Sequence, residues 1–329
     1  MRHSRRKTSR NGRDAAIFTA VDAWAYARYH PQWRLTRKLL KPYGVDRLHL
    51  ALPFLADEKF FWRRIFDRNP DFTLFCDKLA TKAWIARREP QAGLPETLWQ
   101  GTDAREIPEA LLKRRAFLKA SHGWQMNFPV HTAQSREEVV AVGDAYMRER
   151  HGARKHQWGY FDVPPRLLLE ECVGDPGPGI EIKYYTFGSV VEQFVLQRHG
   201  DPVTASRWLR QPDGSYSRDP HRTLISEHID WKPLPDIALE GLEIAARLGA
   251  VCDHLRIDTM VADGKLYMGE LTVYSGGGRA YGQGHLPDAP LNRSWDLRQS
   301  WFLSTPQPGW RGVYAAALRR ALDARGAPP

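Results

Sequence analysis

The amino-acid sequence predicts an α+β protein with antiparallel sheet, and three observations lead to that prediction. Apolar residues recur at helical spacing through most of the first 90 residues. After residue 90, short apolar runs of strand length alternate with amphipathic helical segments. Several of those runs are joined by tight turns that contain glycine, which close hairpins. Helices mixed with hairpins are typical of the α+β class.

Five helices are predicted from amphipathic spacing, at residues 14–30, 57–68, 73–89, 135–152 and 236–249. The second has acidic residues at its start and arginines near its end, which complements the helix dipole. Pro70 and Pro90 stop the second and third helices, because proline disrupts a helix interior. The fourth begins at a Ser135-x-x-Glu138 capping box, and Gly249 ends the fifth.

Six strands are predicted from short apolar runs, at residues 116–121, 166–173, 180–187, 190–197, 255–261 and 265–274. Gly188 and Ser189 form a two-residue turn between the third and fourth strands. Ala262, Asp263 and Gly264 connect the last two. Because both connections are short, these strands are expected to pair antiparallel.

Charge and composition narrow the classes of protein to which the chain can belong. The 329 residues include 48 Lys and Arg against 38 Asp and Glu, a formal net charge of +10. Residues 1–13 hold six of the basic residues and no acidic one, so the rest of the chain carries only +4. A basic tail on a nearly balanced body argues against nucleic acid as the main partner. Hydrophobic residues make up 42%, which argues against a disordered chain.

Cysteine content and apolar runs indicate a cytoplasmic protein. The three cysteines are too few and too scattered for a disulfide framework or a zinc site. The basic N-terminus lacks the apolar segment of a signal peptide. The apolar run 48–56 contains His49 and Pro53 and is far shorter than the roughly 20 residues that span a bilayer. We therefore expect no membrane span.

The sharpest chemical signal is Arg256-x-Asp258 followed by Glu270-x-Thr272 on the last two predicted strands. Residues two apart on a strand share a face. Two carboxylates that repel each other are best neutralised by a hard cation with oxygen ligands. Mg²⁺ fits, because it is usually held by one or two carboxylates together with substrate phosphates. The alternative is a solvated ladder of salt bridges.

Whether the two pairs meet depends on the turn between the strands. A two-residue Asp263-Gly264 turn pairs residue 258 with residue 269, which puts Glu270 on the opposite face. A three-residue loop, 262–264, pairs 258 with 268 and 256 with 270, so that all four polar side chains share one face. Such a loop needs a left-handed residue at its end, where Gly264 stands. We therefore expect the three-residue loop.

The sequence resembles a known family at these and several earlier positions. Arg-x-Asp followed by Glu-x-Thr on a hairpin is similar to the metal-binding end of ATP-grasp enzymes. More closely, the chain from about residue 53 to 305 resembles the TupA-like ATP-grasp family, also called ATP-grasp fold amidoligases. The resemblance rests on the order and spacing of Glu58-Lys59 with Trp62, Asp67-Arg68-Asn69-Pro70, Asp77-Lys78, Phe117-Leu118-Lys119 with His122-Gly123, Leu169-Glu170-Glu171-Cys172-Val173, Glu181-Ile182-Lys183-Tyr184, Asp258 and Gly269-Glu270-Leu271-Thr272.

The resemblance implies an ATP-grasp fold, in which two α+β subdomains with antiparallel sheets clasp ATP, here with a mainly helical N-terminal segment. The implied organisation is a basic tail over residues 1–13, a helical region over 14–90, the nucleotide-binding and catalytic region over 91–305, and a C-terminal helix and tail over 306–329.

ATP and one or two Mg²⁺ ions are the implied cofactors. Lys78 and Lys119 would contact the phosphates as point charges, with His122 beside them. The alternatives are a solvated helical lysine for Lys78, a snorkelling side chain for Lys119 and a plain loop residue for His122. Trp124-Gln125-Met126 follows, where similar proteins have small residues, which indicates a different lid or an altered acceptor.

The adenine would bind at the strand end formed by Glu170, Glu171, Cys172 and Val173, whose backbone groups would read the ring. Alternatively, Glu170 is a surface residue of an edge strand; the Cys172 side chain need only be a small buried hydrophobe. Glu181 would accept hydrogen bonds from the ribose hydroxyls.

The remaining implied roles concern the reacting groups. Asp258 and Glu270 would bind Mg²⁺, with Thr272 a neutral ligand or a helper. Arg256 and Lys183 would stabilise charge on the transferring phosphoryl group or the tetrahedral intermediate. Arg279, which follows three glycines, would bind a substrate carboxylate or lie on the surface.

The implied activity is amide formation from a small-molecule carboxylate and an amine. The carboxylate would attack the γ-phosphate to give an acyl phosphate, and the amine would then displace phosphate. The family's association with cell-surface polysaccharide suggests a sugar acid, an amino acid or a glycan, and a natural-product amide ligase fits equally well. The rivals are an ATP-grasp kinase that phosphorylates a hydroxyl and a non-catalytic module that binds anions through the basic tail.

Overall fold

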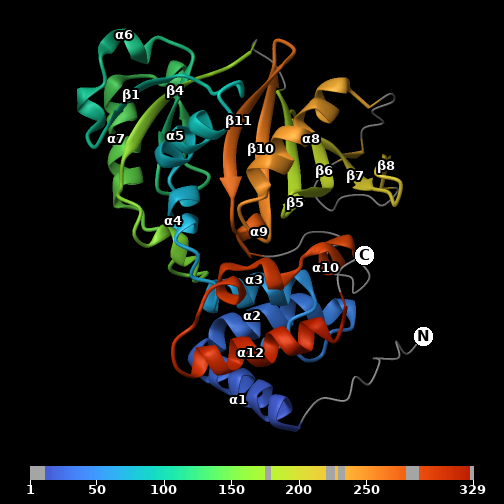
Figure 1. Ribbon diagram of the computed structural model, residues 1–329. Helices are drawn as coiled ribbons and strands as arrows, with labels where there is room; N and C mark the ends of the chain where they lie inside the picture. The colour runs from blue at the N-terminus through green and yellow to red at the C-terminus, as the bar shows by residue number, and fades with distance from the viewer. Residues whose placement is uncertain (1–11, 175–178, 220–226, 229–233, 279–288, 327–329) are drawn as a thin grey trace. The chain divides into compact units, whose positions relative to one another are not determined.

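Contacts divide the chain into two compact units (Figure 1). The computed structural model describes residues 12–174, 179–219, 227–228, 234–278 and 289–326. One unit comprises Met1–Asn69 and Gly276–Pro329, and the other comprises Pro70–Ser275. These positions differ from the divisions expected after residues 13, 90 and 305, which stay a prediction about domains. Within the described ranges, no helix has both the length and the apolar character needed to cross a bilayer.

Helices from both ends of the chain build the first unit: α1 (Gly12–Arg28), α2 (His30–Leu40), α3 (Ala56–Ile65), α10 (Pro290–Ser294), α11 (Trp301–Ser304) and α12 (Trp310–Asp323), with 3-10 turns at Lys41–Tyr43 and Leu297–Gln299. Every residue of α3 is buried. Its Trp62 packs edge-on against Phe302 and donates its indole N–H to the Tyr314 hydroxyl at 2.7 Å. Buried aromatic rings with paired polar atoms therefore hold this unit together. The mainly helical N-terminal segment is confirmed.

The second unit contains a four-stranded antiparallel sheet, in the order β1 (Thr97–Gly101), β4 (Leu167–Glu171), β2 (Ala116–Ala120) and β3 (Asn127–Pro129). Helix α7 (Arg136–Arg148) packs on it through Val139, which joins the core of Leu118 and Leu167. Ser135 caps α7 as expected, because its hydroxyl accepts the Glu138 N–H at 3.3 Å. Short helices flank this sheet at α6 (Glu109–Leu112) and at the 3-10 turns Ala104–Glu106 and Val130–Thr132, whereas the 3-10 turn Trp158–Tyr160 joins the core of the other sheet of this unit.

A seven-stranded sheet completes the second unit, in the order β11 (Lys265–Thr272), β10 (Leu255–Ala262), β5 (Ile180–Phe187), β6 (Val190–Arg198), β7 (Thr204–Arg210) and β8 (Tyr216–Arg218), with β9 (Glu227–His228) parallel to β7. Phe187 pairs directly with Val190, so the predicted turn at Gly188 and Ser189 is confirmed. Helix α8 (Asp236–Gly249), with the predicted bounds, lies against the sheet, where the Tyr184 hydroxyl donates to the Ala238 carbonyl at 3.0 Å (Figure 1).

The two faces of this sheet differ in chemistry. The face under α8 is apolar and fully buried, with Ile182, Phe194, Ile257 and Leu271 in one core. Alternate residues of the same strands point to the other face, because strand side chains alternate. That face is polar, and it carries the charged residues expected at the active site. Two antiparallel sheets combined with helices confirm the α+β class.

Residues 73–89 form two helices, and the single helix expected there is wrong. Helix α4 (Asp71–Cys76) ends before Asp77, and α5 (Lys78–Arg88) begins after it. Asp77 has extended backbone, and its carboxylate accepts the Leu79 N–H at 3.0 Å. An aspartate that caps the next helix in this way interrupts the preceding one. The break places Lys78 at the first position of α5.

Candidate active site

The β10–β11 hairpin turns through two residues, and the expected three-residue loop is wrong. Ala262 pairs directly with Lys265. Asp263 has φ 50° and Gly264 has φ 69°, so both are left-handed. Two consecutive left-handed residues are the geometry of a type I′ turn, for which Asp-Gly is a preferred pair. The twist of this turn matches that of the strands, which favours it over the longer loop.

A β-bulge restores the shared face that this turn would otherwise remove. Thr259 pairs with Met268, but Asp258 pairs with Glu270, so Gly269 is an extra residue on β11. One extra residue reverses the alternation of the side chains beyond it. Glu270 therefore faces the same side as Asp258. The expected pairs of 258 with 268 and 256 with 270 are replaced by 258 with 270 and 256 with 272.

Arg256 and Asp258 form a bidentate ion pair on this face. Arg256 Nε lies 2.6 Å from Asp258 Oδ1, and Nη2 lies 2.5 Å from Oδ2. The two side chains are only 14% and 8% exposed. Burial alone would lower the pKa of Arg256, but the charge and hydrogen bonds of Asp258 keep that pKa well above its ordinary value. Arg256 is thus a fixed, desolvated positive charge.

The donor set opposite this arginine fits Mg²⁺. Among the described residues, the Glu270 carboxylate has no hydrogen bond or ion pair, although it faces Asp258 across the hairpin. The Thr272 hydroxyl lies 3.5 Å from Asp258 Oδ2. Two facing carboxylates and a hydroxyl are oxygen donors of the kind that Mg²⁺ prefers. Mg²⁺ is usually held by one or two carboxylates together with substrate phosphates, which this donor set matches.

Strand β5 brings a second pair of charges to the same face. Lys183 pairs across the sheet with Asp258, and Glu181 pairs with Met260. The Lys183 ammonium bonds to the Glu181 carboxylate, and His199 Nε2 lies 3.2 Å from Glu181 Oε2. Burial would raise the pKa of Glu181, but the hydrogen bond from His199 and the charge of Lys183 outweigh it and lower the pKa to about 2. Glu181 is therefore an ionised acceptor at neutral pH.

We expect the free energy of unfolding to fall more steeply with acid in the wild type than in Glu181→Gln. The folded-state pKa of Glu181 is about 2, below its ordinary 4.5. Its ionised form therefore stabilises the fold above pH 4.5, and this contribution is lost as the pH falls from 4.5 toward 2. Urea denaturation across the acid range measures the difference. Glu243→Gln, whose side chain is 83% exposed, is the control, and identical slopes for Glu181→Gln and wild type would contradict the assignment.

Glu170 lies between two lysines near the end of β4. The Lys119 ammonium bonds to its Oε1, and Lys82 Nζ of α5 lies 2.9 Å from its Oε2. Burial would raise the pKa of Glu170, but the charges of Lys119 and Lys82 outweigh it and lower the pKa. Strand β4 lies between β1 and β2, so Glu170 is not on an edge strand. Its side chain therefore anchors the lysines.

Lys78 lies between the two sheets of this unit. Its ammonium donates to the Gly123 carbonyl, and its backbone N–H donates to the Ser121 carbonyl at 3.0 Å. Burial lowers the pKa of Lys78, and the charge of Glu270 on β11 opposes that shift. The charge of Lys119 on β2 lowers the pKa further. Lys78 is thus a desolvated cation between the carboxylates and the other lysine, and not a solvated helical residue.

The strand end after β4 presents backbone groups that are held by its neighbours. Glu171 donates its N–H to the Glu96 carbonyl at 3.0 Å, and its carboxylate accepts the Glu96 N–H at 2.8 Å. Cys172 donates its N–H to the Arg115 carbonyl at 2.9 Å. Arg115 Nη1 in turn donates to the Gly174 carbonyl at 2.8 Å, and its Nη2 lies 3.6 Å from Cys172 Sγ. Cys172 is half-buried, and its thiol contacts a guanidinium.

The polar groups described so far in this site lie in sequence along β10. In order, they are the strand end with Val173 and Gly174 beside Ala262, Glu181 opposite Met260, the Asp258–Glu270 pair, and Arg256. At about 3.3 Å per residue, the six steps from residue 262 to residue 256 span roughly 20 Å. Backbone polar groups, an acceptor carboxylate, a cation site and a guanidinium can receive the successive parts of an extended nucleotide.

The loop after β2 packs inward. His122 is only 3% exposed, and the Trp124 ring lies 5.5 Å from the His151 ring. A Cβ on Gly123 would lie 2.1 Å from His151, so only glycine fits at this position without displacing that ring. The bulky residues that follow His122 are therefore part of a packed surface against His151.

Arg279 lies outside the described residues, so its predicted role stays a prediction. The three glycines before it, in α9 (Ser275–Gly278), have φ between 63° and 79°. Residues other than glycine rarely adopt such backbone angles, which explains why three glycines occur in succession.

Three residues of this site were not predicted from the sequence: Lys82, Arg115 and Arg207. Lys82 follows Lys78 by four residues, so helical spacing could have placed both on one face. Arg207 is buried on the polar face, two strands away from Lys183, with its Nη2 2.6 Å from an Asp219 carboxylate oxygen. Arg115 has no local sequence signal, because its partners at Cys172 and Gly174 are distant in the chain.

The chain is similar to several solved structures at low sequence identity. Similar structures include D-alanine–D-alanine ligase from Bacillus anthracis, with 15% identity, a TM-score of 0.39, and coverage of 79% of this chain and 73% of that chain. The ATP-grasp ligase PsnB complexed with a minimal precursor has 10% identity, a TM-score of 0.38, and coverage of 77% and 62%. Phosphoribosylamine–glycine ligase from Thermotoga maritima has 15% identity, a TM-score of 0.39, and coverage of 63% and 50%. No curated protein matches the chain significantly.

The sequence also matches the profile of the TupA-like ATPgrasp family over residues 58–292, which is well over half of the chain. The match includes both sheets of the second unit and every charged residue described on their facing surfaces. The chain therefore belongs to the TupA-like ATP-grasp family and has an ATP-grasp fold.

Proposed function

We propose that this ATP-dependent ligase joins a small-molecule carboxylate to an amine through an acyl phosphate. The observation that carries the proposal is the order of groups along β10, where backbone, acceptor carboxylate, paired carboxylates and guanidinium succeed one another. A nucleotide bound in this order has its γ-phosphate near Arg256 and its base near the strand end after β4. The reacting carboxylate then approaches from the Arg256 end.

The nucleotide is held by groups from both sheets. Backbone groups of the strand end around Val173 read the adenine, because the N–H groups of Glu171 and Cys172 already donate to neighbouring carbonyls. The ionised Glu181 accepts hydrogen bonds from the ribose. Lys78 and Lys119 bind the phosphates. Both lysines are already desolvated or paired with carboxylates, so a phosphate oxygen replaces existing protein partners.

Asp258, Glu270 and Thr272 would hold one or two Mg²⁺ ions against the phosphates. When bound, Mg²⁺ neutralises charge that develops on the phosphoryl oxygens. Glu270 is available for this role because, in the described chain, no side chain or backbone group competes for its oxygens.

The chemistry then needs no nucleophilic side chain. A substrate carboxylate oxygen attacks the γ-phosphorus, the bond to ADP breaks, and an acyl phosphate forms. An amine attacks the acyl carbon, loses a proton, and releases inorganic phosphate. Arg256 and Lys183 supply fixed positive charge near the oxygens that become more negative, which is the largest contribution that such a site can make.

The proposed substrates are a sugar acid or an amino acid together with an amine, in surface polysaccharide or natural-product biosynthesis. This class is supported by membership of the TupA-like family and by a site whose fixed cations suit anionic substrates.

Hydroxylamine trapping tests the reaction. The full chain is incubated with ATP, Mg²⁺, hydroxylamine and a panel of amino and sugar acids, and products are identified by mass spectrometry. We expect a hydroxamate of one acid, with ADP and phosphate in equal amounts. A phosphorylated hydroxyl product without hydroxamate would instead establish the kinase, and ADP release that ignores every acid would contradict the ligase.

A further inference from the structure

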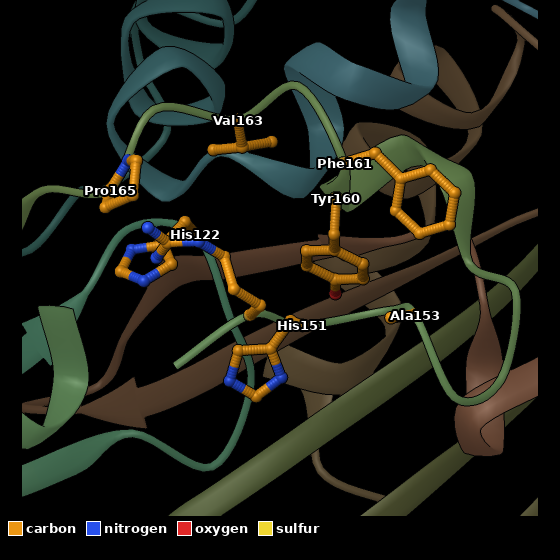
Figure 2. Close-up of a pocket in the computed structure, with 8 residues that line it drawn as sticks. His122, His151, Ala153, Tyr160, Phe161, Val163 and Pro165 are labelled. Carbon is orange, nitrogen blue, oxygen red and sulfur yellow. The ribbon is translucent and has the colours of Figure 1, made fainter. Parts of the chain in front are cut away.

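A pocket in the second unit has no role in the site described so far (Figure 2). Its volume is about 350 Å³, toward the small end of the range for ligand pockets. It opens beside the loop after β2 and the segment that follows α7. Three basic side chains line it, and among its described lining residues none is acidic: His122, Arg150 and His151 supply the charge. The lining therefore favours an anion.

His122 is the strongest indication of a ligand. The residue is 97% buried, and its Nε2 lies 3.1 Å from the Tyr146 carbonyl oxygen. Its Nδ1 is buried and makes no hydrogen bond of normal geometry among the described residues, although the Arg166 backbone lies close enough to raise the pKa of the ring. Buried polar atoms are nearly always paired, so an unpaired ring nitrogen at a pocket wall calls for an explanation. A bound anion would supply the missing partner.

The surroundings of the two histidines are positive. Burial lowers the pKa of both His122 and His151, and the charge of Lys78 adds to that shift at each of them. Arg150 acts in the same direction on His122, whereas Glu149 opposes the shift at His151. An anion in the pocket would reverse this balance and favour protonated rings.

The rest of the wall is apolar and aromatic. Figure 2 shows Tyr160, Val163 and Pro165 around the same cavity as His122 and His151. Such a wall suits the carbon skeleton of a small organic molecule better than a bare inorganic ion. An aromatic ring beside polar groups also suits the apolar face of a sugar.

The pocket adjoins the phosphate end of the active site. His122 follows the β2 strand that carries Lys119 by two residues. The preceding Ser121 carbonyl accepts the Lys78 N–H at 3.0 Å, and the following Gly123 carbonyl accepts the Lys78 ammonium. A carboxylate held by His122 is thus next to the lysine that binds phosphate.

We propose that this pocket binds the carboxylate substrate, with its anionic group on His122, His151 and Arg150 and its carbon skeleton on Tyr160 and Val163. The identification of the bound anion as the group to be phosphorylated rests on the proposed function. The ligand class is a small organic acid, for which a sugar acid and an amino acid are the two sources.

Calorimetric titration of the full chain with ADP and Mg²⁺ present distinguishes these sources. D-glucuronate is compared with D-glucose, and L-glutamate with its diamide. We expect one acid to bind and its counterpart without a carboxylate not to bind measurably. His122→Gln and Arg150→Gln should each weaken binding of that acid at least tenfold. Arg148→Gln, an exposed arginine at the end of α7 that does not line the pocket, should leave binding unchanged.

The affinity for ADP and the midpoint of thermal unfolding are also measured for both variants, to show that each variant folds and keeps its nucleotide site. If His122→Gln fails to fold, Arg150→Gln carries the experiment, because the Arg150 side chain is exposed. The proposal is overturned if neither acid binds, if both variants bind with wild-type affinity, or if they lose ADP affinity instead. Acid binding weakened by the variants without any hydroxamate would keep the pocket and reject the ligase. Hydroxamate formed with an unchanged KM in both variants would keep the ligase and reject the pocket.

Discussion

Glu270→Gln is expected to lower the rate of Mg²⁺-dependent ADP release by on the order of 10²- to 10³-fold, with little change in stability. A divalent ion contributes several kcal/mol to the transition state of phosphoryl transfer, and each ~1.4 kcal/mol is tenfold in rate. Within the described residues, Glu270 makes no hydrogen bond or ion pair, so its replacement by a neutral isostere breaks neither and removes only its longer-range attraction to Lys78. The loss should therefore appear in kcat and not in the unfolding midpoint.

A coupled assay for ADP at saturating ATP measures the effect across a series of Mg²⁺ concentrations. We expect the variant to need more Mg²⁺ for half-maximal rate. Glu243→Gln, on the exposed face of α8, should behave as wild type. Wild-type rate and Mg²⁺ dependence in Glu270→Gln would show that this carboxylate does not bind the ion.

Asp258→Asn is expected to destabilise the protein by about 3–5 kcal/mol as well as to abolish turnover. Arg256 has its bidentate partner in Asp258, and both side chains are nearly buried. A neutral Asn leaves the guanidinium charge desolvated and without an opposite charge at its side. The cost arises from the arginine that remains, and not from the carboxylate that is lost.

The double variant Arg256→Met/Asp258→Asn separates these effects. Removal of the charge that is otherwise stranded should recover most of the lost stability, whereas activity should stay abolished. Urea denaturation of the wild type, both single variants and the double variant forms a cycle that gives the coupling free energy. Additive losses would show that the ion pair contributes nothing to the fold.

In the β10–β11 hairpin, the sequence predicts the alternation of side chains, whereas the register is known only from the structure. The alternation of Arg256 with Asp258, and of Glu270 with Thr272, predicts that each pair shares a face, but the prediction that the two pairs meet depended on the register of the hairpin. The register was wrong, because two features compensate: a two-residue turn and a bulge at Gly269. Both a bulge and a longer loop shift the register by one residue, and the local sequence allows either.

The start of helix α5 could not be predicted from the local sequence. Apolar spacing across residues 73–89 predicts one helix, because Asp77 does not interrupt the pattern. The structure breaks the helix there, since the Asp77 carboxylate caps α5 and also bonds to Arg166 at 2.7 Å. Arg166 immediately precedes β4, far along the chain, so the ion pair that supports the break could not be seen locally.

The sequence by itself determined the α+β class, the positions of the charged residues on strands, and the family to which the chain belongs. These depend on periodicity and on the order of short motifs, which are local properties. Only the tertiary structure decided which cation meets which carboxylate: Lys119 and Lys82 at Glu170, Lys183 at Glu181, and Arg256 at Asp258. It alone also revealed the pocket at His122, because that pocket arises where segments far apart in the chain pack together.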